Sequence, residues 1–179
     1  MKSCRMLAIL VVSCLGSATT ENYTDKLVGF SFVKLPGWTL DPHAPVLGGP
    51  GTCVGMKGPD ATEYEFITIC GKPDITEVVR IDQTLRTGFT KYISWRTGSF
   101  AGETQLTVRP GSLLTGVIDG HESLSVILDY TKNNQAGAAY IVWVQSGKTR
   151  LSVIGETALS NLDSMIERLK PIRDSIRVP

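Results

Sequence analysis

The stretch AAYIVWVQ at residues 138–145 limits the choice of fold more than any other part of this 179-residue chain. It has the length and the β-branched and aromatic content of a strand, and it is apolar at both odd and even positions. Because successive strand side chains point to opposite faces, both sides of this strand should be buried. It therefore belongs in the middle of a sheet that is covered in front and behind.

Further segments of strand composition are joined to this one by short connections rich in turn residues. These segments lie at 27–33, 52–57, 63–70, 103–109, 113–118, 123–130 and 149–156. Together with 138–145 they predict a sheet of about six to seven strands. Short connections favour antiparallel neighbours. The turns are predicted at Pro110-Gly111, at Asp119-Gly120 and at Ser146-Gly147.

Two helices are predicted, far apart in the sequence. Asp74 and Glu77 have the spacing of a capping box, and an apolar stripe follows at three- and four-residue intervals up to Tyr92. Ser160 opens a second helix that should be ended or kinked by Pro171. The expected fold is thus α+β: a single antiparallel sheet flanked by helices on both faces, an αβα sandwich.

Two cysteines are placed to form a disulfide. The pattern predicts a hairpin of TCVGMK (52–57) and EYEFITIC (63–70) around the turn GPDAT. If the hairpin is centred between Ala61 and Thr62, Cys53 lies opposite Cys70. Directly opposed strand residues are close enough for a disulfide, which would stabilise the fold by about 3 kcal/mol. The alternative is two buried free thiols.

The N-terminus has the three-part pattern of an export signal at residues 1–18: a basic start, an apolar run and small polar residues. Cleavage after Gly16-Ser17-Ala18 suits an ordinary signal peptidase. Val11-Val12-Ser13-Cys14 instead resembles a bacterial lipobox, in which Cys14 would be lipidated and would anchor the chain to a membrane. We expect a polar tether at 19–26 and one folded domain at 27–179.

The charge balance argues against nucleic acid as a partner. The net charge is +1, from 18 basic and 17 acidic residues without a long run of either sign. A chain of this size also buries enough surface to fold without a metal. The sequence predicts no cofactor and no metal site.

The order of several short motifs resembles the PsbP-like fold family. These are GFSFVKLPGW at 29–38, VIDGHES at 117–123, two long hairpin strands, and a final helix running into IRDSIRV at 172–178. The family includes the photosystem II extrinsic subunit, the Mog-type Ran-binding protein and DcrB-type bacterial envelope lipoproteins. The resemblance covers 28–178 and implies a docking role rather than catalysis, although the disulfide hairpin is not part of the family pattern.

Candidate site residues are few. Pro36 has no amide donor, so the strand must leave the ladder there or lie at a sheet edge. Gly37 permits a bend, and Trp38 should then anchor the segment on the sheet. The histidines are His43, in a proline-rich loop, and His121, at the Asp119-Gly120 turn. No G-x-S-x-G elbow accompanies them, so a serine hydrolase is not expected.

The function predicted from these features is an exported, non-enzymatic protein of the periplasm or cell envelope, anchored to the outer membrane if Cys14 is lipidated. It would bind an envelope protein partner or aid assembly. The alternative is a carrier for a small apolar or acidic ligand. Trp38, His43 and His121 are the candidate ligand or partner surface.

Overall fold

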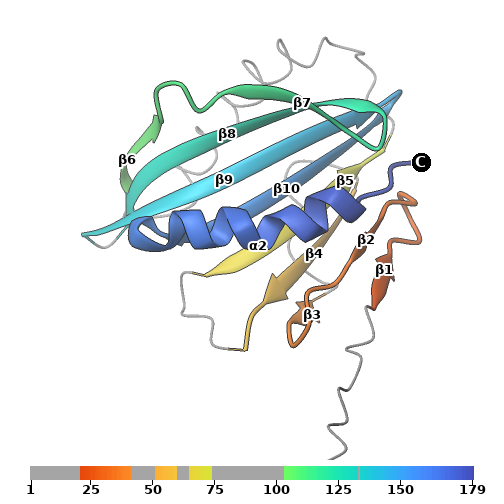
Figure 1. Cartoon of the computed structure of the whole chain (residues 1–179), viewed down its shortest axis with the longest axis horizontal. Helices are drawn as coiled ribbons and strands as arrows, with labels where there is room; N and C mark the ends of the chain where they lie inside the picture. The colour runs from red at the N-terminus through yellow and green to blue at the C-terminus, as the bar shows by residue number, and fades with distance from the viewer. Residues whose placement is uncertain (1–20, 42–50, 60–64, 74–102, 133) are drawn as a thin grey trace, which may run out of the picture.

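A computed structural model of the chain describes residues 21–41, 51–59, 65–73, 103–132 and 134–179 (Figure 1). Eight strands form one sheet in which every pairing is antiparallel. Their spatial order is β3 (Thr39–Asp41), β4 (Thr52–Lys57), β5 (Phe66–Lys72), β10 (Thr149–Ala158), β9 (Gln135–Ser146), β8 (His121–Lys132) and β6 (Glu103–Val108), and β7 (Leu114–Ile118) also pairs with β8.

Strand β9 lies inside the sheet, as its apolar pattern predicts. It pairs along its length with β8 on one side and with β10 on the other. Its side chains alternate between two buried clusters: Val142 and Val144 belong to the cluster under the helix, and Ile141 and Trp143 to the cluster on the opposite face. Both faces of β9 are therefore removed from water.

A 3-10 turn, η1 (Leu159–Asn161), leads into the α-helix α2 (Leu162–Ser175), which lies across one face of the sheet (Figure 1). A Cβ atom added at Gly155 of β10 would lie 2.5 Å from the Leu169 side chain, so the helix packs directly on backbone there. The helix continues through Pro171 instead of ending at it. Leu169 and Ile172, on either side, are buried, and their packing outweighs the hydrogen bond that proline cannot donate.

The chain enters the fold through a separate two-stranded ribbon of β1 (Asn22–Thr24) and β2 (Ser31–Val33). Residues 22–24 lie in the stretch expected to be a tether. The ribbon is attached to the end of α2, because Ser31 and Arg177 exchange backbone hydrogen bonds of 3.0 and 2.9 Å. The Ser175 hydroxyl also accepts a hydrogen bond from the Val33 amide. The C-terminal segment thus joins the ribbon to the main sheet.

The prediction of an αβα sandwich with helices on both faces is wrong. The fold is mainly β, the sheet has eight strands rather than six to seven, and α2 covers one face within the described residues. Burial on both sides of β9 showed that both faces are covered, but it did not show that helices cover them. The helix predicted to begin at Asp74 lies outside the described residues.

The Pro36-Gly37 bend has the structural role predicted for it. Gly37 has a φ of +75°, a conformation that favours glycine. The bend turns the chain from β2 into β3 and places Trp38 in the core under the helix, where it is 8% exposed. A Cβ at Gly58 would be 3.2 Å from the Trp38 ring, so the indole packs on backbone at that point.

Replacing Trp38 by alanine should lower the free energy of unfolding by about 3–5 kcal/mol, because a buried indole is lost and a cavity is left. Thermal unfolding followed by circular dichroism would measure this as a fall of about 2–4 °C per kcal/mol. Leu27→Ala is the control, since Leu27 is 71% exposed. An unchanged melting temperature in Trp38→Ala would show that the ring does not anchor the bend.

Candidate functional site

The disulfide predicted from the sequence is present. Cys53 of β4 lies directly opposite Cys70 of β5, as the hairpin register requires, and their sulfur atoms are bonded with the Cα atoms 4.1 Å apart. The bond ties β4 to β5 on the sheet face away from α2. The arrangement is structural, because it closes the hairpin that carries β3 at one edge of the sheet.

The other candidate residues do not converge on one site. Trp38 is buried in the core, where it offers no surface to a ligand. His121 is half-buried at the start of β8. Its neighbour Asp119 has a φ of +51°, and its carboxylate accepts a 2.9 Å hydrogen bond from the Val178 amide. His43 and Cys14 lie outside the described residues.

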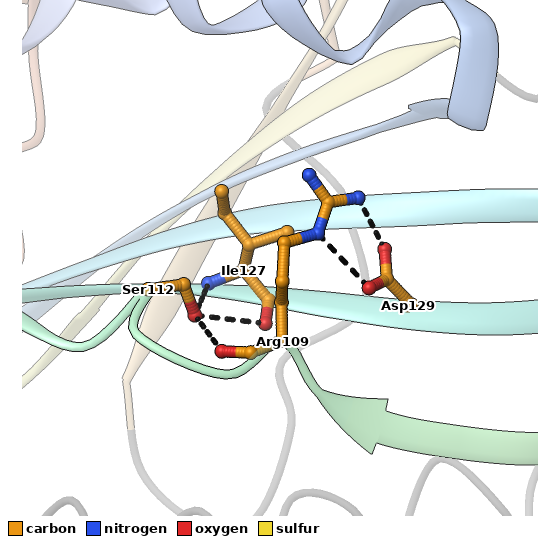
Figure 2. A network of polar contacts seen from close by, with 4 residues as sticks. All are labelled: Arg109, Ser112, Ile127 and Asp129. Atoms are coloured by element: carbon orange, nitrogen blue, oxygen red, sulfur yellow. Dashed lines mark hydrogen bonds and ion pairs between the residues drawn. The ribbon is translucent and has the colours of Figure 1, made fainter.

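The structure draws attention instead to the sheet edge opposite β3. Strands β6 and β7 follow one another along the same side of β8 and are separated by residues 109–113, which contain a turn. We call this segment the bulge, because its five residues lie opposite only Val126 and Ile127 of β8. At this bulge the carbonyl of Ile127 accepts a 2.9 Å hydrogen bond from the Arg109 amide. The Ile127 amide donates to the Ser112 hydroxyl at 3.1 Å, and that hydroxyl donates to the Arg109 carbonyl at 2.7 Å (Figure 2).

An ion pair holds the start of the bulge. The Arg109 guanidinium donates two hydrogen bonds to the Asp129 carboxylate, from Nε at 3.0 Å and from Nη2 at 2.6 Å (Figure 2). The hydrogen bond to Asp129 is the main reason why the pKa of Arg109 is raised, and the negative charge of Asp163 on α2 adds to it. This bidentate contact fixes the direction in which the chain leaves β6.

The hydrogen bonds at Ile127 also determine which backbone groups of β7 face outward. The amide and the carbonyl of Ile127 point toward this edge of the sheet. Because backbone groups alternate along a strand, every second residue of β8 from Ile127 back to His121 also points its amide and carbonyl toward this edge. Their partners on β7 are Leu114, Gly116 and Ile118, which therefore point their backbone groups inward. The backbone groups of Thr115 and Val117 then point away from the sheet. Among the described residues, β7 pairs with β8 alone.

The side chains along this edge are apolar and exposed. Val117 is 71%, Leu114 61% and Leu113 53% exposed. No charged residue and no proline occurs between Ser112 and Ile118, although native edge strands are commonly protected by such residues. We call the side chains of Leu113, Leu114, Thr115 and Val117, with the outward backbone groups of Thr115 and Val117, the β7 edge surface. It can bind an extended chain by main-chain hydrogen bonds and apolar contacts.

Residues 21–41, 51–59, 65–73, 103–132 and 134–179 contain no group of three or more histidine, cysteine or acidic side chains placed to hold a metal ion. In these same ranges no helix has the length and apolar character needed to cross a membrane.

Sequence reasoning did not identify the β7 edge surface. It predicted LLTGVI as a strand before the Asp119-Gly120 turn, and both the strand and the turn are present. The available signal was the absence of charge in a short strand that is apolar on both faces. That signal does not distinguish an edge strand from a central one, because a central strand such as β9 has the same pattern.

Comparison with known proteins identifies the fold but not a sequence relative. No protein-family model matches the chain, and no curated protein sequence matches it. The solution structure of cyanobacterial PsbP (CyanoP) from Synechocystis sp. PCC 6803 is similar, with a TM-score of 0.65 and 15% identity over 100% of this chain and 99% of that one. A crystal structure from Bacteroides thetaiotaomicron VPI-5482 has a TM-score of 0.55 and 9% identity over 89% of this chain and 48% of that one. The PsbP-like fold predicted from the order of the motifs is thereby confirmed.

Replacing Ser112 by alanine should leave the Ile127 amide without its partner and lower the free energy of unfolding by about 1–3 kcal/mol. Amide hydrogen exchange measured by NMR should show faster exchange at Ile127 than in the unmodified protein. Ser160→Ala is the control, because the Ser160 hydroxyl bonds only to the neighbouring Asn161 side chain in an exposed position. Equal protection of Ile127 in both variants would mean that Ser112 does not support the bulge.

Proposed function

We propose that this chain is an exported, non-enzymatic protein of the cell envelope that binds a protein partner through the β7 edge surface. The observation that carries the proposal is the exposure of Leu113, Leu114 and Val117 beside outward backbone groups. Exposed apolar side chains in one patch are typical of interaction sites. A bare sheet edge also offers hydrogen bonds that a partner chain can complete.

Rigid support of this edge favours a binding role over a loosely held strand. The Arg109–Asp129 ion pair and the Ser112 hydroxyl hold the bulge at one end of β7. At the other end, the Asp119 carboxylate is held by the Val178 amide and lies 3.8 Å from Nε of Arg177. A strand fixed at both ends loses little conformational entropy when a partner binds, which favours affinity.

The cellular location rests on the N-terminal sequence. The basic start, the apolar run and the small residues at 1–18 support export. The lipobox-like residues before Cys14 support a lipid anchor, and an anchor of several acyl chains would retain the protein at a membrane. A folded domain held in this way would meet its partner at the envelope.

Lipidation can be tested in a bacterial host that expresses the full chain with a labelled fatty acid. The chain should incorporate the label, and Cys14→Ser should abolish incorporation because the acylated thiol is gone. Cys4→Ser is the matched control and should retain the label. An unlabelled parent chain, or label that survives in Cys14→Ser, would contradict the anchor and leave cleavage after Ala18.

The alternative function, a carrier of a small ligand, receives less support. The candidate ligand surface predicted from the sequence includes Trp38 and His43, but Trp38 is buried beneath the bend that it anchors. Its indole therefore cannot form the wall of an accessible site in this conformation.

Partner binding can be tested by capture from detergent-solubilised envelope with the full chain as bait. We expect one protein to be recovered in a fixed ratio by the parent chain and to be lost with Leu114→Lys/Val117→Lys, since the two charges would be buried against the partner. Leu27→Lys should recover the partner normally, because Leu27 is as exposed as Val117 but lies in the turn between β1 and β2. Equal recovery with all three baits would exclude the β7 edge surface as the binding site.

A further inference from the structure

The β7 edge surface is complementary to itself, and we infer that it pairs with the β7 edge surface of a second copy of this chain. The inference rests on the proposed function in one respect, since both use the same surface. A second copy would then occupy the site until the envelope partner displaces it. The pairing is antiparallel about a twofold axis, the commonest symmetry of homodimers.

The outward backbone groups limit the register. Thr115 and Val117 direct their amides and carbonyls away from β8, so only odd-numbered residues of β7 can exchange hydrogen bonds with a new strand. In a twofold pairing, the two numbers of each opposed pair add to a constant value. A register centred on Thr115 sets Thr115 opposite its own copy, and Leu113 opposite Val117.

Side-chain volume favours this register over its neighbours. On the α2 face it sets Leu114, which is 61% exposed, opposite Gly116 of the second copy, so a bulky residue meets one without a side chain. On the other face it pairs Leu113 with Val117 and threonine with threonine, which are favourable cross-strand pairs. A register centred on Leu114 would set two leucines against each other. One centred on Gly116 would leave a gap between two glycines.

The lack of charge along the paired stretch also favours self-pairing. The paired stretch itself contains no charge, so no ionic group is buried. Arg109 and Asp119, near its two ends, already have partners within the chain in Asp129 and Arg177, so neither charge needs a partner from the second copy. Both helices α2 then lie on the same face of the joined sheet.

The pairing can be tested in the full chain by a single cysteine at the twofold axis. Thr115→Cys should form a disulfide with its own copy under mild oxidation, because opposed Cα atoms in such a pair are about 5.5 Å apart. A band of doubled mass on a non-reducing gel is expected. Thr39→Cys is the matched control: Thr39 is an exposed threonine on β3, the edge strand at the other end of the sheet, and should give no such band.

A second variant tests the register. It also shows whether the disulfide forms only through chance collisions between chains. Thr115→Cys/Val117→Lys should reduce the doubled band at least tenfold, because a lysine would oppose Leu113 of the second copy. Absence of the band in Thr115→Cys, or equal bands in Thr39→Cys or in the lysine variant, would overturn self-pairing. A cross-link to a protein of different mass would also overturn it and would assign the edge to a partner alone.

The two proposals fail separately. If envelope capture depends on Leu114 and Val117 but Thr115→Cys gives no doubled band, partner binding stands and self-pairing is wrong. If the doubled band forms but capture is equal for all baits, the surface pairs copies of this chain and does not bind the captured protein.

Discussion

The contact between α2 and Gly155 of β10 is the constraint on which the rest of the structure depends. Because Gly155 has no side chain, Leu169 and Met165 of the helix pack against the strand backbone itself. The helix held in this position places Arg177 where it bonds to Ser31 of the β1–β2 ribbon. It also places the Val178 amide where it bonds to the Asp119 carboxylate. One close packing contact therefore places three segments that are distant in the sequence, including one end of the β7 edge surface.

The β6–β7 edge of the sheet is stabilised at its bulge, while β7 has no second neighbouring strand among the described residues. The bulge would ordinarily leave the Ile127 amide without a ladder partner, and the Ser112 hydroxyl supplies one. Yet β7 has neither the charged side chains nor the proline that commonly protect exposed strands. Exposed apolar side chains on such a strand are costly in solubility, and the proposed binding role would give a physical reason for retaining them.

The sequence and the structure agree where the pattern is local. The opposed positions of Cys53 and Cys70 follow from counting residues across one hairpin, and the left-handed conformation at Gly37 follows from a Pro-Gly bend. The sequence prediction and the structure disagree where packing between distant parts of the chain determines the structure. Pro171 was expected to end or kink the last helix, but the buried residues beside it carry the helix on to Ser175. The sandwich with helices on both faces failed because burial of a strand does not reveal what buries it.

By itself the sequence determined that residues 138–145 form a central strand, that Cys53 faces Cys70, and that the motif order is PsbP-like, because each depends on spacing along the chain. Only the tertiary structure decided which strand became the open edge. LLTGVI and AAYIVWVQ are both apolar on two faces. The difference arises because β9 has neighbours on both sides, whereas β7 is paired with β8 on one side alone among the described residues, and the identity of neighbouring strands is set by packing of the whole chain.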